Sequence, residues 1–69
     1  MREHPVLSEH EWDLVLELLE RERFQLPIEI HHTRTRTLRE ELRTRLAVVE
    51  DLVLRVSHAV GAGQLIGSA

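Results

Sequence analysis

The sequence predicts an all-α protein, an antiparallel two-helix hairpin that dimerises into a four-helix bundle. Three observations favour this fold: two segments with apolar residues at helical spacing, a Thr- and Arg-rich connection between them, and more apolar residues than two helices can bury. With 69 residues and no Cys, the chain forms one domain at most and has no disulfides. Chains this small commonly rely on a partner for stability.

The first predicted helix spans residues 8–33 and follows an N-terminal arm, residues 1–7. Ser8 and Glu11 form the S-x-x-E capping box that marks a helix start. Apolar residues then recur along one side at helical spacing: Trp12, Val15, Leu16, Leu19, Leu26 and Ile30.

Pro27 predicts a break or kink in this helix, because proline removes a backbone hydrogen bond and crowds the preceding turn. In residues 24–31, however, every second residue is apolar, which is typical of a strand. Either the helix continues with a kink, or it ends near Arg23 and a short edge strand follows. We favour the kinked helix, because a lone strand would find a partner only across a dimer.

The predicted turn is the Thr- and Arg-rich run at residues 33–37. Thr37 and Glu40 repeat the capping-box spacing, so the second helix is expected over residues 38–60. Its apolar spacing is close to the heptad seam of a coiled coil: Leu38, Leu42, Leu46, Val49, Val53, Val56 and Val60.

Gly61 predicts the end of the second helix, because glycine commonly follows the last helical residue. Residues 61–69 are then expected to form a flexible tail. Antiparallel pairing of the two seams predicts three apolar contacts and two ion pairs: Leu19 with Val49, Leu26 with Leu42, Ile30 with Leu38, Asp13 with Arg55 and Glu29 with Arg39.

The charge distribution supports this pairing. Residues 1–33 carry eight acidic residues and three arginines, whereas residues 34–69 carry six arginines and four acidic residues. Helices of opposite charge attract each other along their flanks. The formal net charge of −3 disfavours nucleic acid as the partner.

One hairpin leaves many apolar residues without cover. A stripe this wide calls for contacts on more than one side, which a symmetric dimer would supply. The seam residues of both helices, from Trp12 to Val56, are therefore the expected interface. The further apolar residues outside the seam are Leu14, Leu18, Phe24, Ile28, Val48, Leu52 and Leu54.

Several stretches share a pattern with a known group of proteins: Leu7-Ser8-Glu9-His10-Glu11, Leu18-Leu19-Glu20-Arg21-Glu22, Glu29-Ile30, Thr33 and Arg39-Glu40-Glu41-Leu42. Over residues 7–56 the chain resembles short uncharacterised bacterial proteins built as helical hairpins. The resemblance implies the fold and dimerisation, and it implies no activity. Pro27, Arg34 and Arg36 depart from the family's pattern.

Glu29 and His32 have the Glu-x-x-His spacing by which di-iron bundles bind metal. Glu40 or Glu41 across the turn could add a carboxylate, and such ligands suit iron, zinc or manganese. Both side chains point away from the predicted seam, however, whereas bundle ligands point inward. We therefore expect no metal and no cofactor, with a metal site at Glu29, His32 and Glu40 as the alternative.

Five arginines around the turn form a basic patch that could contact phosphate, an acidic protein or nucleic acid. Neighbouring glutamates dilute this charge, and no Phe, Tyr or Trp lies among these arginines to stack bases. We favour a solvated turn with ion pairs, and the alternative is a small regulator that binds nucleic acid or a partner there. The five residues are Arg34, Arg36, Arg39, Arg43 and Arg45.

No residue set predicts catalysis. Ser8 is explained as a helix cap, and Ser57 lacks the Gly-rich setting of a nucleophile. Since the sequence shows neither a signal peptide nor a membrane-spanning run, we expect a cytoplasmic protein. The favoured function is a non-enzymatic, homo-oligomeric helical module for protein association, with a second copy of itself as partner.

Overall fold

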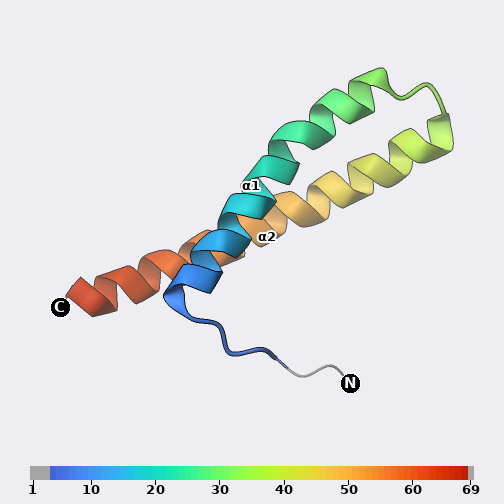
Figure 1. Cartoon of the computed structure of the whole chain (residues 1–69). Helices are drawn as coiled ribbons and strands as arrows, with labels where there is room; N and C mark the ends of the chain where they lie inside the picture. The colour runs from blue at the N-terminus through green and yellow to red at the C-terminus, as the bar shows by residue number, and fades with distance from the viewer. Residues whose placement is uncertain (1–3, 69) are drawn as a thin grey trace.

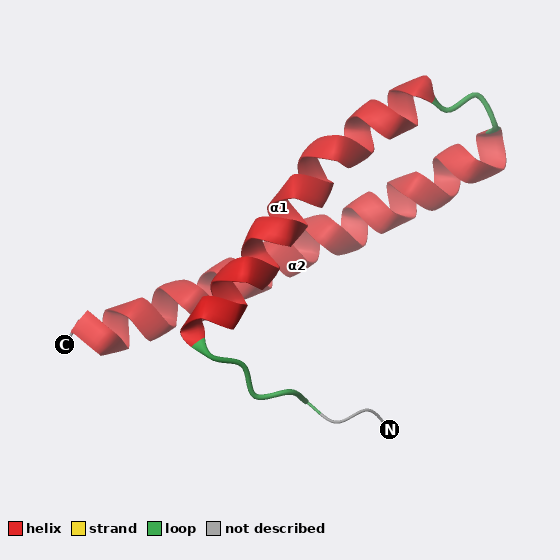
Figure 2. Ribbon diagram, viewed as in Figure 1, coloured by secondary structure: helices red, strands yellow, loops and turns green. Residues whose placement is uncertain are grey.

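Two packed helices joined by a short turn make up the fold. The computed structural model describes the backbone of residues 4–68 and the side chains of residues 4–61. Helix α1 spans Glu9–His32 and helix α2 spans Arg36–Ser68. They run antiparallel, so the start of α1 and the end of α2 lie opposite to the turn (Figure 1). Residues 4–68 contain no strand (Figure 2), which confirms the predicted all-α hairpin.

The capping box at the start of α1 is formed as predicted. The backbone N–H of Glu11 donates to Ser8 Oγ at 3.2 Å, and the backbone N–H of Ser8 donates to Glu11 Oε1 at 2.8 Å. Two donors that no helical carbonyl can reach are thereby satisfied. The helix therefore begins where the sequence places it. Of the predicted arm, residues 4–7 are not helical and residues 1–3 lie outside the described part.

Helix α1 continues through Pro27 to His32, so the alternative of a strand over residues 24–31 is wrong. A strand would place Phe24, Leu26 and Ile28 on one side. Instead Leu26 is 1% exposed, whereas Phe24 is 75% exposed and Ile28 58%. Helical geometry thus puts Leu26 alone into the core, and its burial offsets part of the cost of proline in a helix.

The turn is shorter than predicted, because it comprises residues 33–35 and α2 already begins at Arg36. The backbone N–H of Arg39 donates to the carbonyl of Thr35 at 2.9 Å, which starts the helix there. The predicted second capping box is wrong, since Thr37 lies inside α2 and the carboxylate of Glu40 pairs with Arg36 at 3.4 Å.

The predicted stop at Gly61 is also wrong. Helix α2 continues through this residue to Ser68. A glycine ends a helix by taking a positive φ angle, and no glycine in the described backbone does so. The expected flexible tail over residues 61–69 is therefore replaced by helix as far as Ser68, and Ala69 lies outside the described part.

The core lies along the seam between the helices. Leu26 of α1 and Val49 and Val53 of α2 are buried together. The half-buried residues Leu16, Leu19, Leu42 and Leu46 pack against them. The predicted apolar partners Leu19 and Val49, and Leu26 and Leu42, thus share one cluster, as the antiparallel register requires.

The ion pairs differ from the predicted ones. Arg55 pairs with Asp51 at 2.8 Å rather than with Asp13, because a partner one turn away on the same helix is closer. Arg39 bonds to the backbone of the turn and not to Glu29. Among the described side chains, the ion pair that links the helices joins Arg45 Nε to Glu22 Oε1 at 2.7 Å.

Replacing Pro27 should stabilise the hairpin. In Pro27→Ala a backbone N–H returns, and the clash with the preceding turn disappears. The free energy of unfolding, measured by urea denaturation followed by circular dichroism, should rise by about 1–3 kcal/mol. Pro5→Ala, in the non-helical segment before α1, should leave it unchanged. A less stable Pro27→Ala protein would mean that the helix depends on proline here.

The capping box should make stability sensitive to acid. The backbone N–H and then the hydroxyl of Ser8 hold the pKa of the Glu11 carboxyl below its usual value of 4.5. The stabilisation from this lowered pKa is therefore complete above pH 4.5 and is lost as the pH falls through the folded-state pKa. Wild type should be more stable than Glu11→Gln in neutral urea titrations, and this advantage should shrink in acid. An advantage that is constant with pH would contradict the pairing.

Candidate functional site

The predicted interface residues line the seam of the single hairpin. Val49, Val53 and Val56 are buried with Leu26. Leu38 differs, because it is 46% exposed in the first turns of α2. The remaining predicted residues are half-buried: Trp12, Val15, Leu16, Leu19, Ile30, Leu42 and Leu46. The predicted interface residues are thus used largely for packing within the chain.

The chain exposes much more surface than its mass requires. Its accessible area is 6139 Å². A compact monomer of 8.1 kDa would expose about 4,500 Å². The radius of gyration is 15.0 Å, against about 11 Å for a compact domain of this length. The excess of about 1,600 Å² is roughly twice what each partner buries in a standard protein interface.

Beside the seam lies an exposed apolar face, which we define by Leu14 and Leu18 of α1 and Val48 and Leu52 of α2. The Glu22–Arg45 ion pair marks one side of the seam. Leu18 lies one turn from Glu22, and Val48 lies three residues from Arg45, so the side chains of Leu18 and Val48 lie on that same side. Leu14 is 53% exposed, Leu18 50% and Val48 53%, and Leu52 is half-buried. Both helices contribute, so this face belongs to the folded hairpin.

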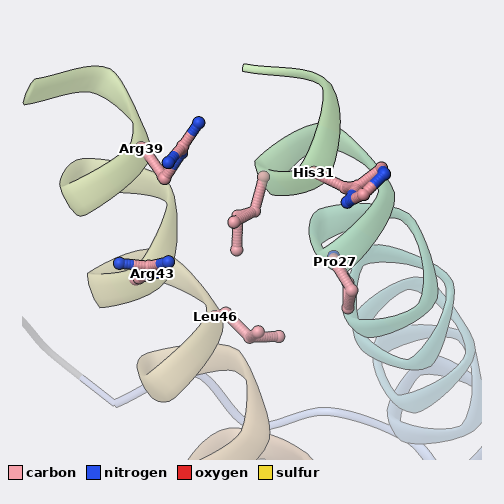
Figure 3. A pocket seen from close by; sticks show the side chains of 6 residues that line it. Pro27, His31, Arg39, Arg43 and Leu46 are labelled. Carbon is pink, nitrogen blue, oxygen red and sulfur yellow. The ribbon is translucent and has the colours of Figure 1, made fainter. Parts of the chain in front are cut away.

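On the other side of the seam, near the turn, α1 and α2 border an open groove of about 600 Å³. Pro27 and His31 line it from α1, and Arg39, Arg43 and Leu46 line it from α2 (Figure 3). Ile30 is the sixth residue, and we call this site the turn groove. None of its six lining residues is acidic, so it joins apolar contacts to positive charge.

Arg39 links the turn groove to the turn. Its Nη2 and Nε donate to the carbonyl of Thr33, at 2.6 and 3.2 Å. Thr33 also caps α1, since its hydroxyl donates to the carbonyl of Glu29 and its N–H to that of Ile30. The guanidinium therefore lies at the negative end of the α1 dipole, where a cation is stabilising. This two-point contact of the guanidinium with the Thr33 carbonyl, which we call the Arg39 fork, holds the turn and fixes the direction of the Arg39 side chain.

The predicted basic patch is divided between different partners. Arg36 pairs with Glu40, and Arg45 pairs with Glu22. Arg39 and Arg43 both line the turn groove. Within the described side chains, neither Arg34 nor Arg43 takes part in an ion pair. The structure thus brings two of the five arginines together at one site rather than presenting all five as one surface.

The alternative metal ligands Glu29, His32 and Glu40 are exposed and do not form a ligand group. Glu40 is paired with Arg36, and the ring of His32 meets that of His31 edge to face with centroids 5.4 Å apart. Among the side chains of residues 4–61, no three His, Asp or Glu residues are grouped to hold a metal ion.

Comparisons with known proteins identify no relative. No family model matches the chain, no curated protein is detectably similar to it, and no solved structure is detectably similar either. The resemblance to short bacterial helical-hairpin proteins therefore stays a prediction. Over the described residues, neither helix has the length and apolarity needed to cross a bilayer.

Sequence reasoning missed the turn groove. It found the arginines but treated them as a solvated turn, and it assigned Ile30 and Leu46 to the seam. The available signal was the spacing of Arg39 and Arg43, which places both on one side of α2. The side chains from α1 that complete the groove were not predictable from that spacing, because they depend on how the helices cross near the turn.

Removing the Arg39 fork should loosen the turn. Arg39→Ala should lower the free energy of unfolding by about 1 kcal/mol in urea titrations, because it removes a charge-assisted bond to Thr33. Arg39→Lys keeps the charge but loses the two-point contact, so it should fall between wild type and Arg39→Ala. Arg34→Ala, within the turn, is the control and should have little effect. Equal stability of all four proteins would show that the fork does not hold the turn.

Proposed function

We propose that the protein is a non-enzymatic module that associates with a second copy of itself, and that two hairpins form a four-helix bundle. The observation that carries this proposal is the excess accessible area of about 1,600 Å² over a compact monomer of the same mass. A chain that exposes this much area buries only a small core, and a small core gives a single copy little stability. A partner that covers one side of the hairpin would remove much of it from water.

A second copy is the partner that the composition favours. The hairpin has an acidic first half and a basic second half, so two copies offer each other complementary charges as well as apolar contacts. Symmetric dimers are the commonest soluble oligomers, and antiparallel helix pairs assemble readily into four-helix bundles. In the cell, such a bundle would serve to bring proteins together.

The apolar face is the surface that we propose for this contact. Leu14, Leu18 and Val48 are each about half exposed, so a facing hairpin could still bury a substantial area at each. The Glu22–Arg45 ion pair borders the face and offers a polar rim. A two-fold axis through this face would bring the same residues of both copies together, as a symmetric interface requires.

Sedimentation equilibrium of the full chain at micromolar concentration should give about twice the mass of 8.1 kDa. Leu18→Glu should weaken association by more than about tenfold, because it puts a charge into the apolar face. Leu54→Glu is the matched control, since Leu54 is also exposed but lies on α2 away from this face.

Two results would overturn the proposal. One is a folded wild-type monomer, with the full helical signal in circular dichroism, at every concentration tested. The other is a Leu54→Glu protein that dissociates as readily as Leu18→Glu, because association would then not depend on the apolar face.

A further inference from the structure

We propose that the turn groove is a second, separate binding site, which takes an acidic amphipathic helix from a partner protein. This inference goes beyond self-association, because the groove and the apolar face lie on different sides of the seam. At about 100° per residue, Pro27 and His31 of α1 and Arg39 and Arg43 of α2 fall on the side away from the Glu22–Arg45 ion pair. Association through the apolar face therefore leaves the groove open.

The lining of the groove sets the chemistry of its ligand. Ile30 and Leu46 are half-buried and Pro27 offers its ring, so the groove presents apolar contacts between its two walls. Arg39 and Arg43 add donors and positive charge at its edges, and His31 adds its ring nitrogens (Figure 3). A ligand that fits both features has an apolar stripe flanked by carboxylates.

Among the described side chains, no acidic residue forms an ion pair with Arg39 or Arg43. Glu40 pairs with Arg36 at 3.4 Å, and Glu22 pairs with Arg45 at 2.7 Å. Arg39 donates to the uncharged carbonyl of Thr33, which fixes the direction of its side chain and leaves it without a carboxylate partner among the described side chains. A guanidinium already held in place loses less conformational entropy when it binds a carboxylate.

The spacing of the arginines favours a helical ligand. Arg39 and Arg43 are four residues apart on α2, so they repeat after about one turn, or roughly 6 Å along the axis. Glutamates four residues apart on a docking helix repeat at the same distance and could meet both arginines. An antiparallel helix pair with an apolar groove also suits a third helix, the helix-in-groove mode of recognition.

Nucleic acid fits this site less well. The imidazole of His31 is the one aromatic ring among the six lining residues, no Phe, Tyr or Trp is there to stack successive bases, and Ile30 and Leu46 offer nothing to a phosphate backbone. The formal net charge of −3 further opposes a duplex. The apolar lining of the groove also distinguishes an acidic amphipathic helix from a simple polyanion, because only the helix has apolar side chains that can contact it.

The test measures binding of a fluorescent synthetic helix of about 16 residues to the full chain by anisotropy. The peptide carries Leu at three- and four-residue spacing and Glu pairs four residues apart beside that stripe. It should bind wild type saturably. Arg43→Glu should weaken binding at least tenfold, whereas Arg21→Glu, which changes the net charge equally but lies on α1 outside the groove, should stay within about twofold.

Two further ligands and one control complete the design. A peptide with Gln in place of Glu, and a peptide with Ser in place of Leu, should each bind at least tenfold more weakly. Sedimentation of Arg43→Glu should give the same mass as wild type, which separates this site from self-association. The proposal is overturned if wild type shows no saturable binding, if Arg43→Glu and Arg21→Glu behave alike, or if a DNA duplex binds more tightly than the acidic helix.

Discussion

Two helices packed side by side share a single seam, and each helix can bury only one stripe of its side chains along it. In this chain the seam centres on Leu26, Val49 and Val53, and the half-buried leucines around them extend it. Apolar residues that do not face the seam stay in contact with water. The elongated shape, the large accessible area and the apolar face all follow from this one geometric limit.

The turn determines what happens at one end of the seam. Because only residues 33–35 connect the helices, the end of α1 and the start of α2 must lie close together there. The Arg39 fork on Thr33 holds this connection and at the same time occupies one edge of the turn groove. The same side chain thus supports the fold and shapes a surface. Charge that stabilises the end of α1 is also available to an acidic ligand beside it.

Much of the fold was predictable because it depends on local chemistry. The capping box of Ser8 and Glu11 involves groups within four residues, so sequence spacing was sufficient to find it. The helical period also placed Leu26 in the core despite Pro27. The start of α2 was not predictable in the same way, because the Thr37–Glu40 spacing imitates a cap while Thr35 begins the helix. The helix end predicted at Gly61 was wrong for a related reason, since glycine permits a helix to end but does not require it to do so.

The candidate site was less predictable than the fold. The register predicted that charges of the two helices would meet, but Asp51 lies one turn from Arg55 and competes successfully with Asp13. The turn groove combines residues from both helices, and its shape depends on the crossing of the helices. Sequence patterns report which side of a helix a residue lies on, and they do not report how far apart two helices are.

The dependence of thermal unfolding on protein concentration tests most directly whether this hairpin relies on a second copy. If folding and association are coupled, a hundredfold increase in concentration should stabilise the protein by about 2.7 kcal/mol, and the Tm should rise by several degrees. Circular dichroism between about 1 and 100 µM would show this. A Tm that does not change over that range, for a protein with full helical signal, would contradict self-association.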